Sequence, residues 1–333
     1  MRHLYTEEAA ARATAEYAGE IFEAICMAEE AKRINVELID SQPDIDWTMR
    51  PRLLAFLFEA HEALRLRPET MTLAVSILDR YSSRRIVYAR HYQLVGCVSL
   101  LVAAKFLDDK RRVPSVSDLS YLCANAFAPH MFSEMERHIL ETLQWDVSAP
   151  TSLEFLDILF LDLCQSGCLP ARTPAEIPHY TAMAQYMCMC ALFNREMIAY
   201  GPRAVATAAV ELTCAILASL TGEFPGQSFR LSGTIRECFD SLVALIVSPP
   251  PQISAWTSKS EYNVPALIQQ FFAATYDQSE DDCSICSTPD NPEAWYRLPR
   301  TPDTLSPLVL RKPTQRAASA VNSVWANSES HWT

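Results

Sequence analysis

Residues 91–106 read HYQLVGCVSLLVAAKF, a stretch in which apolar side chains cover almost every face of a helix. Between Leu94 and Ala104 the apolar residues are too closely spaced to leave room for a polar side. A helix that is apolar all round is surrounded by other helices, whereas a surface helix keeps one polar face. This stretch therefore predicts the central helix of an all-α bundle.

Four further helices are expected around this one. Residues 49–65 and 69–83 each repeat apolar side chains at helical spacing on one face only. A fourth helix begins after the N-cap Ser115, and a fifth spans about 129–143 with a proline near its start, where the missing N–H costs nothing. These helices form a first predicted domain over residues 41–150.

The same order of patterns returns after residue 150. A helix opens at Thr151, another covers 176–194, and Arg203–Leu220 is an alanine-rich stretch as poor in polar residues as 91–106. We therefore expect an all-α fold with two tandem five-helix repeats, the second over residues 151–247. Two unrelated helical bundles are the alternative.

The two ends of the chain differ from these blocks. Residues 6–34, with Thr6 as N-cap, predict a long amphipathic helix within an N-terminal segment, 1–40. Residues 248–333 are rich in Pro, Ser and Thr, with a possible short helix at 262–275, and predict a disordered regulatory tail.

The composition excludes several classes of protein. Only 7 of 333 residues are glycine, which argues against sheets and phosphate-binding loops. The formal net charge of -12 argues against nucleic-acid binding, and no apolar run is long enough for a membrane span. The 11 cysteines lie mostly in apolar helical stretches and predict reduced, buried thiols of an intracellular protein.

No set of residues predicts catalysis, a metal or a cofactor. His61-Glu62 lacks the second histidine four residues after the first that a zinc-binding helix needs. Cys283-x-x-Cys286 is a single pair without a second pair at finger spacing. The helical block is therefore expected to bind a protein partner.

Four charged residues stand at positions where apolar ones are expected. Arg50 and Asp79 interrupt the stripes of two helices, and they could form a buried ion pair or be two solvated charges. Lys105 ends the most apolar helix, and Glu136 interrupts the helix at 129–143. These two could pair with each other or hydrogen-bond the main chain of a partner, and physical reasoning alone slightly favours the internal salt bridge.

Several short motifs occur in the order found in a cyclin box, over roughly residues 40–150. They are Met49-Arg50-Pro51-Arg52-Leu53, Ile77-Leu78-Asp79-Arg80-Tyr81, Gln93-Leu94-Val95-Gly96, Ala104-Lys105-Phe106 and Met135-Glu136-Arg137, followed by Ile139-Leu140 and Trp145-Asp146. The chain thus resembles the cyclin family. Ser82-Ser83-Arg84 and the run from Lys105 to Arg112 are similar to fungal G1-type cyclins.

The resemblance implies a regulatory subunit, itself no enzyme, that activates a cyclin-dependent kinase at the G1/S transition. Lys105 and Glu136 would hydrogen-bond the backbone beside the kinase's regulatory helix, and Arg50–Asp79 would be an internal brace. The apolar residues that would pack against that helix are Val102, Phe106, Leu140 and Val147. A cyclin-fold scaffold of the transcription machinery, without kinase activation, is the alternative.

The resemblance also implies a substrate-docking patch. Its members would be Met49, Leu53, Phe56 and Glu59. Phe56 replaces the tryptophan usual in mitotic cyclins, which favours a leucine/proline-rich docking motif over Arg-x-Leu. Alternatively, these residues simply fill the apolar stripe of the first helix.

The tail contains three sites typical of proline-directed kinases, at Thr288, Thr301 and Ser306. Residues 298–302 resemble a phosphodegron that an F-box ubiquitin ligase reads. We expect the protein in nucleus and cytoplasm, although Lys110-Arg111-Arg112 is too short a cluster to direct it there.

Overall fold

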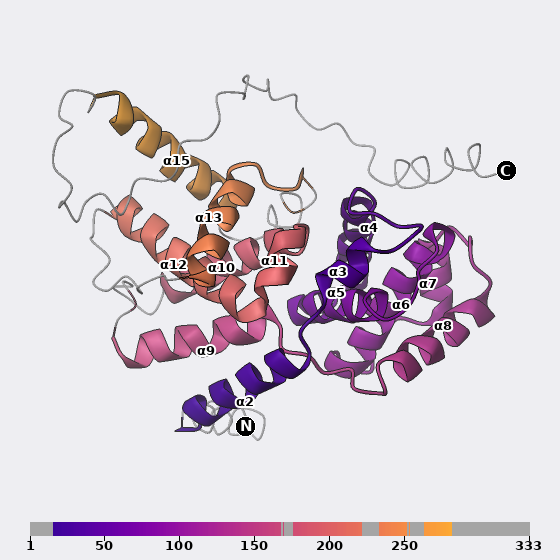
Figure 1. The fold of residues 1–333 in the computed structure, drawn as a ribbon. Helices are drawn as coiled ribbons and strands as arrows, with labels where there is room; N and C mark the ends of the chain where they lie inside the picture. The colour runs from indigo at the N-terminus through magenta and orange to yellow at the C-terminus, as the bar shows by residue number, and fades with distance from the viewer. Residues whose placement is uncertain are drawn as a thin grey trace.

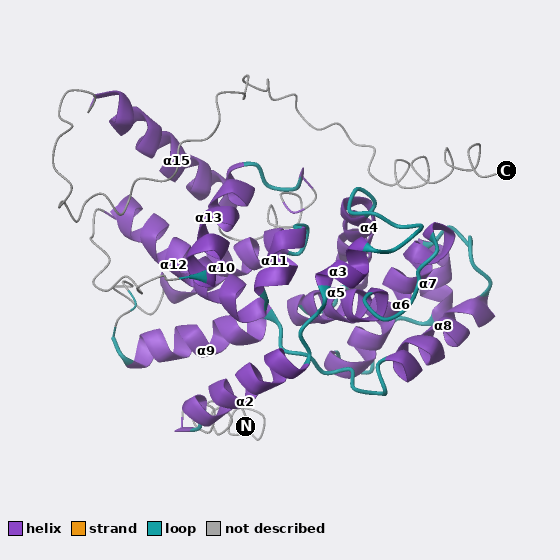
Figure 2. Ribbon diagram, viewed as in Figure 1, coloured by secondary structure: helices purple, strands orange, loops and turns teal. Residues whose placement is uncertain are grey.

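The computed structural model describes residues 16–167, 169, 176–221, 233–251, 253 and 263–281. Over these ranges every regular element is an α-helix or a short helical turn, and none is a strand (Figure 2). The helices gather into two blocks that lie next to each other, the N-terminal one around α6 and the C-terminal one around α12 (Figure 1). The expected all-α fold of two helical units is confirmed. None of the described helices is long and apolar enough to cross a membrane.

The N-terminal block contains the five helices expected from the sequence. They are α4 (Arg50–Leu64), α5 (Pro68–Ser82), α6 (Ala89–Leu107), α7 (Val116–Leu122) and α8 (Pro129–Thr142). Every side chain of α6 from Tyr92 to Ala104 is buried, and α4, α5 and α8 all pack against this helix. The apolar stretch at 91–106 is therefore the central helix, as predicted.

Two capping boxes fix the starts of α7 and α9 (Ser152–Gln165). The Ser115 side chain accepts from the backbone N–H of Asp118, whose carboxylate accepts in return from Ser115. Thr151 and Glu154 make the same exchange at the start of α9. Both satisfy N–H groups that a helix otherwise leaves unpaired at its N-terminus. The linker between the blocks, residues 143–151, thus ends at the N-cap Thr151.

The C-terminal block is larger than the sequence indicated. It comprises α9, α10 (Ile177–Ala191), α11 (Arg195–Tyr200), α12 (Pro202–Thr221), α13 (Thr234–Val247) and α15 (Val264–Asp281). The stretch predicted as one helix at 176–194 ends near Ala191, and Asn194 then caps the separate α11.

The packed part of the chain also continues past Val247, where we expected the second repeat to end. Helix α15 packs against α12 and α13, with Val264, Ile268 and Phe272 buried. The prolines that follow residue 248 end α13, but they do not end the block, because α15 returns to cover the same core.

Helix α2 (Ala18–Ala31) lies across the C-terminal block, against α9 and α12. Its Phe22 ring packs edge-on against Phe155 of α9, at 6.1 Å between centroids. This helix corresponds to part of the one predicted over 6–34, whose N-cap Thr6 lies outside the described residues. A short helix, α3 (Val36–Asp40), follows it and was not predicted; Asn35 caps its N-terminus.

Candidate protein-binding site

The end of α6 and the middle of α8 present an ion pair on the surface of the N-terminal block. The Lys105 Nζ lies 2.5 Å from the Glu136 Oε1, and these side chains are 48% and 20% exposed. Of the two possibilities left open by the sequence, the free chain adopts the internal salt bridge. An exposed pair of this kind contributes only about 0–1 kcal/mol, so exchanging it for contacts with a partner costs little.

Apolar residues surround this ion pair at different depths. Phe106 is 54% exposed and Leu140 is partly buried, whereas Val102 and Val147 are 4% and 9% exposed. Of the four residues expected to pack against a partner helix, Phe106 thus projects from the surface and Leu140 is partly buried. Val102 and Val147 form a buried floor beneath them.

A small depression adjoins Phe106 on the side of the linker. It is lined by Glu69, Leu73, Phe106, Leu107, Ser148, Ala149, Thr151 and Glu154. Burial raises the pKa of the Glu154 carboxyl above its ordinary value, and the hydrogen bond from the Thr151 N–H works against this rise. The depression therefore combines an apolar wall with an acidic rim.

Two cations hold the linker that contributes Val147 to this site. Arg80 on α5 donates to the carbonyl oxygens of Asp146 at 2.7 Å and of Val147 at 3.2 Å. Lys32, just after α2, donates to the Asp146 carboxylate at 2.7 Å and to the Ser148 carbonyl at 2.6 Å. Two charged residues for which no role was predicted therefore hold the part of the floor that carries Val147. The signal for Arg80 was its position directly after Asp79 in the motif at residues 77–81.

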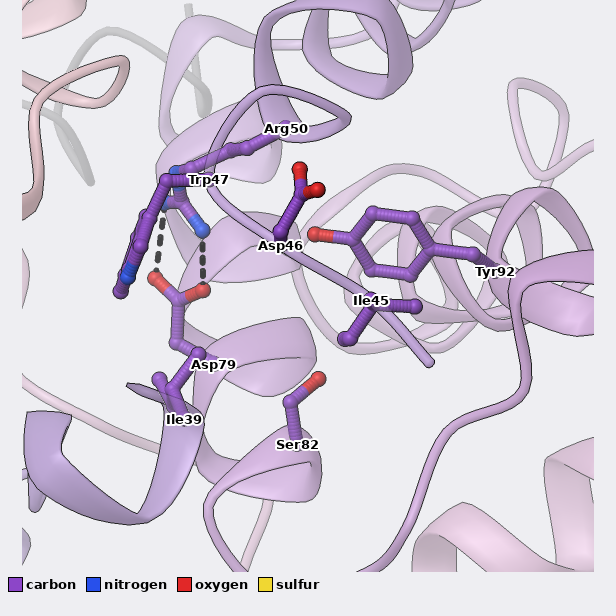
Figure 3. Close-up of a pocket in the computed structure, with 8 residues that line it drawn as sticks. All are labelled: Ile39, Ile45, Asp46, Trp47, Arg50, Asp79, Ser82 and Tyr92. Atoms are coloured by element: carbon purple, nitrogen blue, oxygen red, sulfur yellow. Dashed lines mark hydrogen bonds and ion pairs between the residues drawn. The ribbon is translucent and has the colours of Figure 1, made fainter. Parts of the chain in front are cut away.

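Arg50 and Asp79 form a buried, bidentate ion pair beneath the surface (Figure 3). The distances are 2.5 Å from NH1 to Oδ1 and 2.9 Å from NH2 to Oδ2, and the side chains are 2% and 5% exposed. Burial alone would lower the pKa of Arg50, but the Asp79 carboxylate outweighs it, so the pKa is raised. The pair is thus an internal brace and not two solvated charges.

The space beside this brace is too small for a ligand. Figure 3 shows Ile39, Ile45, Trp47 and Tyr92 around the ion pair, and the free volume of about 10 Å³ corresponds to roughly one water molecule. The Arg50 guanidinium lies over the Trp47 ring at 5.6 Å, and burial raises the pKa of Tyr92 to about 12. We conclude that this region stabilises the fold.

The predicted substrate-docking patch is not an open surface. Leu53 and Phe56 are 1% and 5% exposed, Met49 is partly buried, and only Glu59 is exposed. Leu53 instead packs directly on Gly96 of α6. The burial of Leu53 and Phe56 favours the alternative, that these residues fill the apolar stripe of α4.

The remaining candidates contribute no site in the described ranges. Within them no three His, Cys, Asp or Glu side chains come together as a metal site would require. Five of the described cysteines are buried free thiols, as expected, while Cys164 is exposed. The pair Cys283 and Cys286 and the tail residues Thr288, Thr301 and Ser306 lie outside the described residues.

Comparison with known proteins identifies what the chain is similar to. Residues 20–148 match the family described as the N-terminal domain of cyclin. The G1/S-specific cyclin CCN1 of Candida albicans is 35% identical over 232 residues, which are 67% of this chain and 33% of that protein. Cyclin puc1 of Schizosaccharomyces pombe is 42% identical over 144 residues, 43% of this chain and 40% of that protein. The chain thus spans well under half of the length of these two relatives.

A solved structure shows the same fold. The viral cyclin from herpesvirus saimiri matches 78% of this chain and 99% of its own, with a TM-score of 0.52 and 20% sequence identity. The match reaches beyond residue 148 and therefore includes much of the C-terminal block.

Proposed function

Because this chain belongs to the cyclin family, with the cyclin N-terminal domain at residues 20–148, we propose that it binds and activates a cyclin-dependent kinase. The kinase would supply the whole chemistry of phosphoryl transfer. The names of the Candida albicans relatives support a role at the G1/S transition. We also propose that the chain directs the kinase to substrates.

The observation that carries this proposal is the exposed Phe106 ring beside the Lys105–Glu136 pair. An apolar anchor next to adaptable polar groups is typical of the centre of a protein interface. In the complex, Lys105 would donate to backbone carbonyls beside the kinase's regulatory helix, and Glu136 would accept from backbone N–H groups. Phe106 and Leu140 would pack against that helix, above the floor of Val102 and Val147.

Activation follows from the difference between two affinities. A kinase that exchanges between an inactive and an active position of its regulatory helix is shifted only by a partner that binds the active form more tightly. A rigid site favours this selectivity, because a surface that deformed easily would fit both forms. The hydrogen bonds of Arg80 and Lys32 to the linker supply that rigidity here.

The test is to mix the purified full-length chain with monomeric cyclin-dependent kinases and measure histone phosphorylation. We expect strong stimulation by the wild type and loss of it for Lys105→Glu and Glu136→Lys. A matched charge change at an exposed position elsewhere, Asp162→Lys on α9, should leave stimulation intact. Absence of stimulation with several kinases would refute the proposal and favour the scaffold alternative.

We further propose that phosphorylation of the tail controls the lifetime of the protein. The Leu298-Pro299-Arg300-Thr301-Pro302 stretch would be recognised by an F-box ubiquitin ligase once Thr301 is phosphorylated. A Thr301→Ala protein should then decay more slowly in cells than the wild type, with Thr288→Ala as the control for a neighbouring site. Decay at the wild-type rate would contradict the role of Thr301.

A further inference from the structure

The loop between α5 and α6 combines exposed apolar and cationic side chains. Ile86 is 62% exposed and Tyr88 53% exposed, although both are large apolar residues. Residues 82–91 contain three arginines, Arg84, Arg85 and Arg90, and no acidic residue, in a chain whose formal net charge is -12. All three arginines are exposed. Such a local reversal of charge beside apolar side chains is unlike an ordinary solvated loop.

The backbone of this loop is held in place from below. The Gln42 amide nitrogen donates to the carbonyl oxygens of Ser82 at 2.6 Å and Arg85 at 2.7 Å, and its oxygen accepts from the Val87 N–H at 2.9 Å. The Val87 side chain is 2% exposed, and Asp44 accepts from the Ala89 N–H. Ile86 and Tyr88 are therefore presented on a preorganised backbone, which reduces the entropy lost when a partner binds.

The arginines keep most of their hydrogen-bonding capacity. Arg84 and Arg85 each donate one hydrogen bond to Thr142, and the Arg90 guanidinium lies over the Tyr88 ring at 5.7 Å. Within the described ranges none of the three forms an ion pair with a carboxylate. A guanidinium has five N–H donors and prefers carboxylates or phosphates in bidentate geometry. Anionic groups are thus the missing partners.

We propose that residues 84–90 form a docking surface for an acidic peptide segment that contains an apolar residue, carried by a substrate protein. Carboxylates of the segment would pair with Arg84, Arg85 and Arg90, and its apolar side chain would pack against Ile86 and Tyr88. This surface is separate from the predicted docking patch on α4, whose Leu53 and Phe56 are buried.

The position of this surface allows it to act while the kinase is bound. Arg90 stands near the start of α6 and Lys105 near its end, so the rise per residue of a helix separates them by about 22 Å along the axis. Binding of the peptide is independent of the proposed kinase activation. Only the claim that the peptide belongs to a substrate rests on that function.

The binding test uses the full-length chain alone. The probe is a fluorescein-labelled eight-residue peptide with six glutamates around a Leu-Leu pair, and its binding is followed by fluorescence anisotropy. We expect saturable binding that weakens with salt, and about tenfold or more loss of affinity in the Ile86→Asp and Arg90→Glu variants. The matched control is Arg111→Glu, an exposed position in the loop that follows α6, which should bind within about twofold of the wild type.

Three results would overturn the docking surface. They are equal binding of a peptide with lysines for glutamates, equal binding of one with alanines for the leucines, and equal loss of affinity in the Arg111→Glu variant. A wild-type dimer in sedimentation that Ile86→Asp makes monomeric would assign the surface to a second copy of this chain instead. Unchanged melting temperatures of the variants show that a loss of affinity does not reflect misfolding.

A kinase assay then separates this inference from the proposed function. The acidic peptide fused to a histone-type substrate should lower its KM with the wild-type complex and not with the Arg90→Glu complex, at equal kcat. An equal KM for both complexes would contradict the role in substrate docking. Peptide binding without stimulation of any kinase would leave the surface standing and refute the kinase proposal alone.

Discussion

The Arg50 guanidinium donates two hydrogen bonds to the carbonyl oxygen of Leu192, from Nε at 3.1 Å and from NH2 at 3.0 Å. Leu192 lies 142 residues further along the chain, in the turn after α10. Because Arg50 is also paired with Asp79, one buried cation joins α4, α5 and the C-terminal block. The two blocks should therefore lose their stability together.

The first prediction concerns this brace. Replacing Asp79 with alanine leaves Arg50 buried without its carboxylate, which should lower the free energy of unfolding by about 3–5 kcal/mol. Urea unfolding followed by circular dichroism measures the change, with Asp162→Ala on the exposed face of α9 as control. A double variant, Arg50→Met with Asp79→Leu, should recover much of the loss, because it removes both charges. A loss below about 1 kcal/mol for Asp79→Ala would contradict the brace.

Only part of this brace could be predicted from the sequence. Helical periodicity placed Arg50 and Asp79 on apolar stripes but left open whether they were buried, because charges at the edge of a stripe are often solvated. The resemblance to cyclins favoured the pair. The bond to Leu192 was beyond prediction, because a backbone carbonyl has no side-chain signal and any residue could stand there.

The same limit of sequence patterns applies to the predicted docking patch on α4. Leu53 and Phe56 repeat at helical spacing, and periodicity predicts one apolar face without saying whether another helix or a partner covers it. That α6 covers this face of α4 follows from the contact of Leu53 with Gly96, which is known only once the two helices are placed against each other. The exposure of Ile86 and Tyr88 could not be predicted from the sequence either, because two apolar residues in a loop form no periodic pattern.

A second prediction separates the two exposed surfaces of the N-terminal block. Phe106→Ala removes a ring that is 54% exposed, so it should change the free energy of unfolding by less than about 1 kcal/mol. It should nevertheless reduce kinase stimulation by about tenfold or more, since central aromatic residues dominate binding energy. Tyr88→Ala, at the opposite end of α6, is the matched control in a histone assay. Equal effects of the two variants on stimulation would contradict the assignment of Phe106 to the kinase.

A third prediction concerns pH and His61, which is 3% exposed near the end of α4. Its Nε2 lies 2.8 Å from the Arg67 carbonyl oxygen and so carries the proton, while Nδ1 is buried without a hydrogen-bond partner among the described residues. Burial lowers the pKa of His61 below its ordinary 6.5, so the unfolded chain takes up a proton at a higher pH than the folded chain. The free energy of unfolding should therefore fall as the pH decreases below 6.5, by at most about 1.4 kcal/mol per pH unit from this group.

Urea unfolding between pH 5 and pH 8 of the wild type and of His61→Gln measures this contribution. Glutamine can still donate to the Arg67 carbonyl but does not titrate, so the variant should show a smaller dependence on pH below 6.5 and the same dependence above it. Parallel curves over the whole range would show that His61 has the same pKa in the folded and unfolded chain.

The last prediction concerns the contact of the two helices at Gly96. A Cβ atom added there would lie 2.8 Å from Leu53 Cδ1 and 3.3 Å from its Cγ, so the whole end of a side chain that is 1% exposed would have to move. Alanine favours a helix over glycine by up to about 1 kcal/mol, whereas overpacking a core costs about 1–3 kcal/mol. We expect the second effect to win, so that Gly96→Ala lowers the melting temperature. Combining it with Leu53→Ala should cost less than the sum of the two single changes, because the shorter side chain makes room for the new methyl group. A Gly96→Ala protein that melts above the wild type would show that Leu53 can shift freely, and that α4 and α6 are packed less tightly than their buried side chains indicate.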